Sequence, residues 1–158
     1  MHESLSYSCQ EKPLTALLVQ NWLASCGGLF KNSSVGADFF IDVPKYFEWS
    51  WVAFKLCSAK KKLRFLDDAT FKVNDTDGSL SKDRENTEAF IDFTTRMLEH
   101  SEDLGIQSGL KNRLGAAYHA AADQALQEGE KRRAWYYHLR SLNTFSNFKF
   151  LPFTRYLF

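Results

Sequence analysis

The spacing of apolar residues changes character partway along the chain. Residues 13–20, PLTALLVQ, predict a short helix with proline in its first turn, where the missing N–H costs nothing. Residues 22–30, WLASCGGLF, predict a short strand whose paired glycines allow another group to approach the backbone closely. From Pro44 to Ser58 the apolar positions recur at helical spacing, and the lysines at 60–62 suit the end of that helix.

Two further short apolar runs follow and predict strands. They are LRFL at residues 63–66 and ATFKV at residues 69–73, separated by a pair of aspartates. Strands and helices therefore alternate over residues 1–82, as they do in α/β layers.

Beyond residue 82 no strand-like alternation recurs, and the apolar residues form helical stripes. The stripes are Phe90, Phe93, Met97 and Leu104, then Leu110, Leu114, Ala117, Ala121 and Ala125, then Ala134, Trp135, His138, Leu139 and Leu142. Gly129 breaks the second helix from the third, which predicts a helical hairpin. We therefore expect an α/β (α+β) protein, mostly helical overall, in which a partial α/β layer (1–82) precedes a C-terminal helical hairpin or bundle (83–158).

Composition places limits on the function. The 158 residues are 44% apolar, enough for a real core, and the net charge of +1 gives no reason to expect nucleic acid. No apolar run reaches the roughly 18 residues of a membrane span, and the N-terminus lacks a signal pattern, so we expect a cytoplasmic protein. Cys9, Cys26 and Cys57 are widely spaced, which favours thiols over a disulfide or a metal site.

An acidic loop, NDTDG at residues 74–78, carries the clearest candidate chemistry. Asn74, Asp75 and Asp77 are hard oxygen ligands that suit a divalent cation. The same residue types dominate simple turns, because they hydrogen-bond their own backbone and tolerate left-handed dihedral angles. Both interpretations stay open.

The C-terminal segment, residues 131–158, interleaves basic residues with large aromatic ones. That pattern suits a membrane surface, with rings at the headgroup level and cations on anionic lipid. It is also typical of a capping helix that packs on the domain. His100, His119 and His138 lie on predicted helices without ligand-spaced partners, which favours packing over catalysis.

Several short motifs, read in order, resemble the C-terminal part of family 2 glycosyltransferases of the GT-A type. They are GGLFK, GADFFID, FEWSWVAFKL and FKVNDTDGSLSKD, and their order carries the resemblance. It implies a nucleotide-sugar-binding α/β fold that transfers a sugar from a nucleotide-sugar donor to a glycan or lipid-linked acceptor, in surface polysaccharide synthesis.

The resemblance also implies roles for individual residues. Glu48 would be the catalytic base, Trp49, Trp51 and Lys72 would bind substrate, and Asn74, Asp75 and Asp77 would hold Mn²⁺ or Mg²⁺. For Glu48 the alternative is a residue that stabilises the start of a helix, and for the two tryptophans it is packing in the core.

The chain differs from the family pattern at two residues and in the extent of the sequence. Trp49 stands where the family has an aspartate, and Asn74 stands where a histidine often holds the metal. Most of the nucleotide-binding N-terminal half is absent, so donor and acceptor binding are expected only together with that half, and the chain alone is expected to be inactive. The alternatives are a degenerate transferase relative or a non-catalytic helical interaction module.

Overall fold

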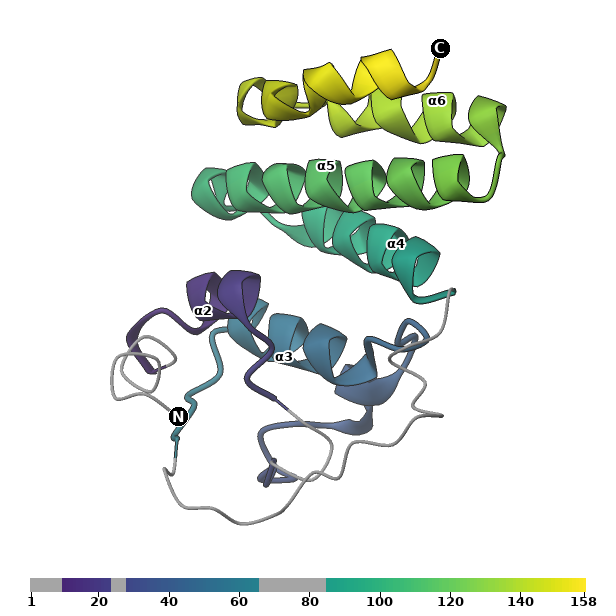
Figure 1. The fold of residues 1–158 in the computed structure, drawn as a ribbon. Helices are drawn as coiled ribbons and strands as arrows, with labels where there is room; N and C mark the ends of the chain where they lie inside the picture. The colour runs from purple at the N-terminus through teal and green to yellow at the C-terminus, as the bar shows by residue number, and fades with distance from the viewer. Residues whose placement is uncertain (1–9, 24–27, 66–84) are drawn as a thin grey trace. The chain divides into compact units, whose positions relative to one another are not determined.

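The computed structural model describes residues 10–23, 28–65 and 85–158, with only the backbone at residues 85 and 86 (Figure 1). The chain divides into two compact units, Met1–Asp83 and Arg84–Phe158, and each is described by itself. The regular elements in the described ranges are all helical, which confirms the mostly helical prediction.

The strands predicted at residues 22–30 and 63–66 do not form in the described parts of these segments. Instead, the Trp22 indole N–H donates a 2.9 Å hydrogen bond to the carbonyl oxygen of Pro13, and its ring meets the edge of Phe65 with centroids 5.3 Å apart. These side-chain contacts replace backbone pairing, so no part of the expected α/β layer appears there. The third predicted strand, residues 69–73, lies outside the described residues.

The described residues of the first unit include three short helices besides the helical residues 10 and 11. They are α2 (Pro13–Val19), the 3₁₀ helix η1 (Ala37–Phe40) and α3 (Glu48–Ser58), and α3 contacts both of the others. The core side chains of this unit are Ala16, Leu17, Leu23, Trp51, Val52, Ala53, Phe54 and Leu56. The Lys55 ammonium ties η1 to α3, because it donates to the carbonyl oxygens of Asp38 (3.2 Å) and Ile41 (2.7 Å). The helix predicted at 13–20 is confirmed, and the one predicted at 44–58 is confirmed from Glu48 onward.

The second unit is a bundle of longer helices. It contains α4 (Glu85–His100), α5 (Leu104–Gln127), α6 (Lys131–Ser141) and the 3₁₀ helix η3 (Phe145–Tyr156). Figure 1 shows α5 between α4 and α6, with η3 running beside α6 to the C-terminus. The predicted hairpin of α5 and α6 around Gly129 is confirmed.

The alanine-rich stripe of α5 is buried, as predicted. Leu110, Leu114, Ala117, Ala121 and Ala125 are all in the core. Small side chains let α6 lie close to α5. At Gly115 of α5 even a methyl group would collide with Asn147 of η3, because an added Cβ would lie 2.0 Å from the amide nitrogen of Asn147.

Two assignments to the apolar stripes are wrong. Leu104 begins α5 and does not extend α4, and it is 80% exposed. Leu139 is 64% exposed, because the buried line of α6 runs through Ala134, His138 and Ser141.

Candidate functional site

Glu48 is the first residue of α3 and lies at the surface. Its carboxylate oxygen Oε1 accepts a 3.1 Å hydrogen bond from the backbone N–H of Tyr46. A glutamate that satisfies a backbone donor just before its own helix has the geometry of a helix-start residue, which is the alternative that the sequence leaves open.

The two neighbouring tryptophans have different surroundings. Trp49 is half-buried and lies among Phe30 and Phe40, with ring centroids 6.3 Å away in each case. Trp51 is 3% exposed and stacks on Phe54 at 5.4 Å, so it is a core residue of the first unit.

The predicted metal loop lies outside the described residues. Lys72, Asn74, Asp75 and Asp77 all fall in that segment, so their convergence with Glu48 stays a prediction. Within residues 10–23, 28–65 and 85–158, no group of three or more histidine, cysteine, aspartate or glutamate side chains is placed to hold a metal ion.

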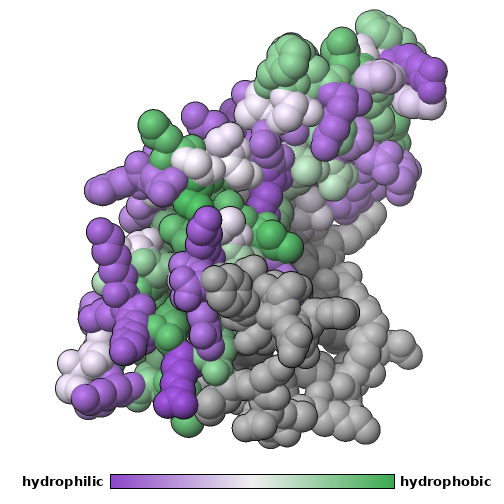
Figure 2. All heavy atoms as spheres, turned by 90° about the vertical axis from the view of Figure 1, so that its left-hand side faces the viewer, coloured by the Kyte–Doolittle hydropathy of each residue, from purple (hydrophilic) through white to green (hydrophobic). Residues whose placement is uncertain are grey.

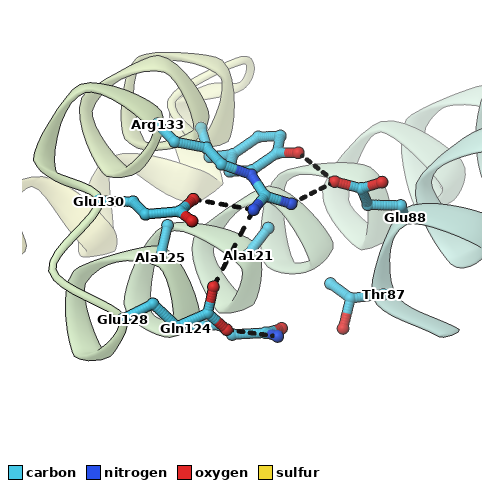
Figure 3. Close-up of a pocket in the computed structure, with 9 residues that line it drawn as sticks. Thr87, Glu88, Ala121, Gln124, Ala125, Glu128, Glu130 and Arg133 are labelled. Carbon is cyan, nitrogen blue, oxygen red and sulfur yellow. Dashed lines mark hydrogen bonds and ion pairs between the residues drawn. The ribbon is translucent and has the colours of Figure 1, made fainter. Parts of the chain in front are cut away.

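A pocket of about 310 Å³ opens in the second unit between α4, α5 and α6 (Figure 3). The Arg133 guanidinium lies at its centre. It is bound by the carboxylate of Glu88 on α4 and by that of Glu130 at 2.9 Å, and a carboxylate oxygen of Glu128 lies 4.0 Å away. The Tyr137 hydroxyl donates a 2.8 Å hydrogen bond to Glu88. Carboxylates already surround the cation, so this network joins α4 to α6 and offers no open site for an anion.

The protonation states in this pocket follow from the contacts. The hydrogen bond from Tyr137, and then that from Arg133, lower the pKa of Glu88 below its ordinary value. Burial raises the pKa of Tyr137. Hydrogen bonds to Glu130, Tyr137 and Glu88 raise the pKa of Arg133, which keeps the guanidinium charged. At neutral pH Glu88 is therefore a carboxylate, Arg133 a cation and Tyr137 a neutral hydroxyl.

A different surface is formed by η3, whose residues sort by the three-residue period of a 3₁₀ helix. Phe145, Phe148 and Leu151 form one row, and they are 88%, 52% and 54% exposed. The next row is exposed and polar and carries Lys149 and Arg155. We call these five side chains the η3 face.

The third row of η3 anchors the helix through its first three members, Asn147, Phe150 and Phe153. Asn147 is 2% exposed and donates a 2.8 Å hydrogen bond to the side-chain oxygen of Asn143, and Phe150 and Phe153 pack on His119 of α5. Because η3 is held in this way, the η3 face is presented on a fixed element. The packing expected of a capping helix is confirmed for this segment. The other two rows of η3 are exposed to solvent.

The charged side chains of the C-terminal segment that contains the η3 face are all basic. Residues 131–158 contain Lys131, Arg132, Arg133, Arg140, Lys149 and Arg155, and no aspartate or glutamate. Toward the top of Figure 2, where α6 and η3 lie in Figure 1, apolar (green) and hydrophilic (purple) side chains adjoin. None of the helices within the described ranges has both the length and the apolar character needed to cross a bilayer.

Sequence reasoning identified residues 131–158 as a candidate but missed the row itself. The available signal was the spacing of Phe145, Phe148 and Leu151, which has a period of three. The Arg133 network was missed because Glu88 and Arg133 are 45 residues apart, and no local pattern joins them.

Comparison of the chain with protein-family models, with curated proteins and with solved structures finds no match. The glycosyltransferase relationship therefore stays a prediction from short motifs.

Proposed function

We propose that this protein attaches to anionic membrane surfaces through the η3 face. The observation that carries the proposal is the row of Phe145, Phe148 and Leu151 beside Lys149 and Arg155 on one anchored helix. Apolar side chains that enter the headgroup boundary and cations that meet anionic lipid are the two components of interfacial binding.

The free energies of burying apolar side chains and of placing cations near anionic lipid favour membrane binding by the η3 face. Fully burying a phenylalanine or leucine side chain is worth about 1.5–3 kcal/mol, and each cation near an anionic surface adds about 1 kcal/mol. Large apolar side chains are costly to leave in water, yet Phe145 is 88% exposed and Leu151, on the same row, is 54% exposed. A surface that buries both would recover that free energy.

The charge of the segment suits an anionic surface. Residues 131–158 carry basic side chains and no acidic ones, and a positive surface is complementary to a negative one such as anionic lipid. The transferase activity implied by the sequence resemblance is a separate prediction that depends on the loop at residues 72–77.

Sedimentation with vesicles tests the proposal. We expect binding to vesicles that contain phosphatidylserine at low salt, weaker binding at high salt, and little binding to pure phosphatidylcholine. The triple variant Phe145→Ser/Phe148→Ser/Leu151→Ser should reduce binding at least tenfold, because it removes the apolar row. Leu104→Ser is the matched control, since Leu104 is 80% exposed on the same unit but lies outside the η3 face.

Charge-reversal variants provide a second test in the same sedimentation experiment. Lys149→Glu/Arg155→Glu should weaken binding to anionic vesicles, whereas Lys111→Glu, at an exposed position on α5, should not do so to a comparable extent. Circular dichroism should confirm that every variant keeps its helices. Absence of binding at low salt, or equal binding by the triple variant, would exclude the η3 face as a membrane site and leave a protein partner as its explanation.

A further inference from the structure

Two histidines lie where η3 packs on the rest of the second unit. His138 on α6 is completely buried, and His119 on α5 is half-buried. Both rings contact Phe153 of η3, with centroid distances of 5.5 Å for His138 and 5.0 Å for His119. His119 also stacks on Phe150 at 4.1 Å. The two imidazoles therefore form part of the surface that holds η3.

The hydrogen bonds of His138 define which of its nitrogens can take up a proton. The Thr154 hydroxyl donates to the carbonyl oxygen of Leu151 at 2.7 Å, so its oxygen is left to accept from His138 Nε2–H at 2.8 Å. His138 Nδ1 is then the unprotonated nitrogen. It is buried and has no hydrogen-bond partner among the described residues. A proton added there would have no acceptor.

His119 is in a similar position, since its own Nδ1 is buried and lacks a partner in the described part of the chain. The charged groups that face it are Asp123 on its own helix, which favours the charged ring, and Lys149 on η3, which opposes it. Burial lowers the pKa of His119 more than either charge changes it, and burial and the neighbouring His119 lower the pKa of His138. Only Asp123 favours protonation.

We propose that His119 and His138 form a pH-sensitive latch that holds η3 on α5 and α6 when both rings are neutral and releases it when they are protonated. Protonation places two cations in contact with Phe153, that of His119 also near Lys149, and neither Nδ1 has a buried acceptor among the described residues. Detachment of η3 exposes both rings to water, where the charge is solvated.

The direction of the effect follows from linkage. Both pKa values are lowered in the docked state, so the undocked state binds more protons and docking becomes more stable as pH rises. The latch is fully closed above the ordinary histidine value of about 6.5 and weakens as pH falls below it. Each histidine whose docked pKa lies one unit lower contributes up to about tenfold to the opening equilibrium.

Hydrogen–deuterium exchange of the full chain at pH 7.5 and pH 5.5, corrected for the intrinsic rate at each pH, tests the latch without any lipid. We expect peptides from residues 145–157 to lose protection severalfold at pH 5.5, while peptides from α4 keep theirs. The variant His119→Gln/His138→Gln should remove that pH dependence, and His100→Gln, at an exposed position on α4, should leave it intact. Equal protection at both pH values, or the same loss in the double variant, would overturn the latch.

A titration of the unaltered protein by NMR covers the case in which the double variant does not fold. The latch requires the rings of His119 and His138 to titrate below about 6.5, and a pKa at or above that value for both would exclude it. The proposal rests on contacts inside the second unit and not on membrane binding, so the two can fail separately.

Discussion

The two units end their principal helices with the same backbone motif but with different residues. In α5, the N–H of Gly129 bonds to the carbonyl oxygen of Leu126 at 3.0 Å, and that of Glu130 bonds to Ala125 at 2.8 Å. This is a Schellman motif, and Gly129 adopts the positive φ of 78° that the motif requires. Its lack of a Cβ makes that conformation inexpensive.

In α3, a lysine occupies the equivalent position. The N–H of Lys60 bonds to Cys57 at 2.9 Å and that of Lys61 bonds to Leu56 at 2.9 Å, so the motif is complete, but Lys60 has a φ of 51°. Asp42 and Tyr46 in the same unit also have positive φ, whereas the positive-φ residue of the second unit is a glycine. The first unit therefore stores backbone strain that the second unit, in its described residues, avoids.

The comparison teaches where each unit obtains its stability. A left-handed residue with a side chain costs roughly 1–2 kcal/mol, so contacts elsewhere must hold it in place. In the first unit such contacts come from Lys55, which binds two carbonyl oxygens near η1, and from the aromatic packing of Trp51 on Phe54. In the second unit, local signals such as the Asp103 cap of α5 agree with the tertiary packing.

Adding a methyl group at one tightly packed glycine in each unit should produce the largest contrast. At Gly115 a Cβ would lie 2.0 Å from the amide nitrogen of Asn147, which is buried and hydrogen-bonded to Asn143. At Gly28 the nearest atom is 2.9 Å away, at the far end of the half-buried Phe30 side chain and not on a buried amide. We expect Gly115→Ala to lower the free energy of unfolding by about 2 kcal/mol even after a gain of about 1 kcal/mol in helix propensity.

Gly28→Ala should cost less than about 1 kcal/mol, because a side chain that moves relieves the contact. Urea unfolding followed by hydrogen exchange of each unit measures both effects. Ser108→Ala, at an exposed position on α5, controls for propensity alone. Equal losses in the two units would show that Asn147 is free to move and that the packing of α5 against the 143–147 segment is looser than the structure indicates.

Exchanging the residues at the two Schellman positions should change the free energy of unfolding by less than Gly115→Ala does. The change should have opposite signs in the two units. Lys60→Gly relieves the left-handed lysine and should stabilise the first unit by up to about 1 kcal/mol. Gly129→Lys introduces the same strain and should destabilise the second unit by about 1 kcal/mol, although no atom lies within 4 Å of an added Cβ. Thermal unfolding of the two variants and of the unaltered chain is the measurement, and shifts of the same sign would contradict the strain argument.

The longer helices could be predicted from the sequence, because their apolar stripes repeat often enough to define a period. The buried line from Leu110 to Ala125 and the break at Gly129 are examples. The short runs at 22–30 and 63–66 form no strand in their described residues, and a few apolar residues fit a strand and an irregular segment equally well. Trp22 bonds to Pro13 and packs on Phe65 through its side chain, which periodicity does not report.

The candidate sites were predicted less well than the helices. Residues 131–158 were identified from composition, but the η3 face depends on a 3₁₀ period that is uncommon over twelve residues. Lys60 carries no sequence signal for a positive φ. The pairing of Glu88 with Arg133 depends on how α4 and α6 meet on α5, which is a property of the tertiary fold.

Removing the charge of Glu88 should change the free energy of unfolding least among these variants. The pH dependence of that change shows whether the charge stabilises the fold. The side chains of Glu88 and Arg133 are 58% and 44% exposed, so solvent screens the pair and Glu88→Gln should cost less than about 1 kcal/mol at pH 7. The folded pKa of Glu88 is lowered from 4.5, so its stabilising effect is complete above about that pH and disappears as pH falls through the lower folded value. The difference in free energy of unfolding between the unaltered chain and Glu88→Gln should therefore shrink below pH 4.5. Glu99→Gln, at an exposed position on the same helix, is the control. A difference that stayed constant from pH 7 to pH 3 would mean that the charge of Glu88 does not stabilise the contact between α4 and α6, and that the hydrogen bond from Tyr137 alone holds it.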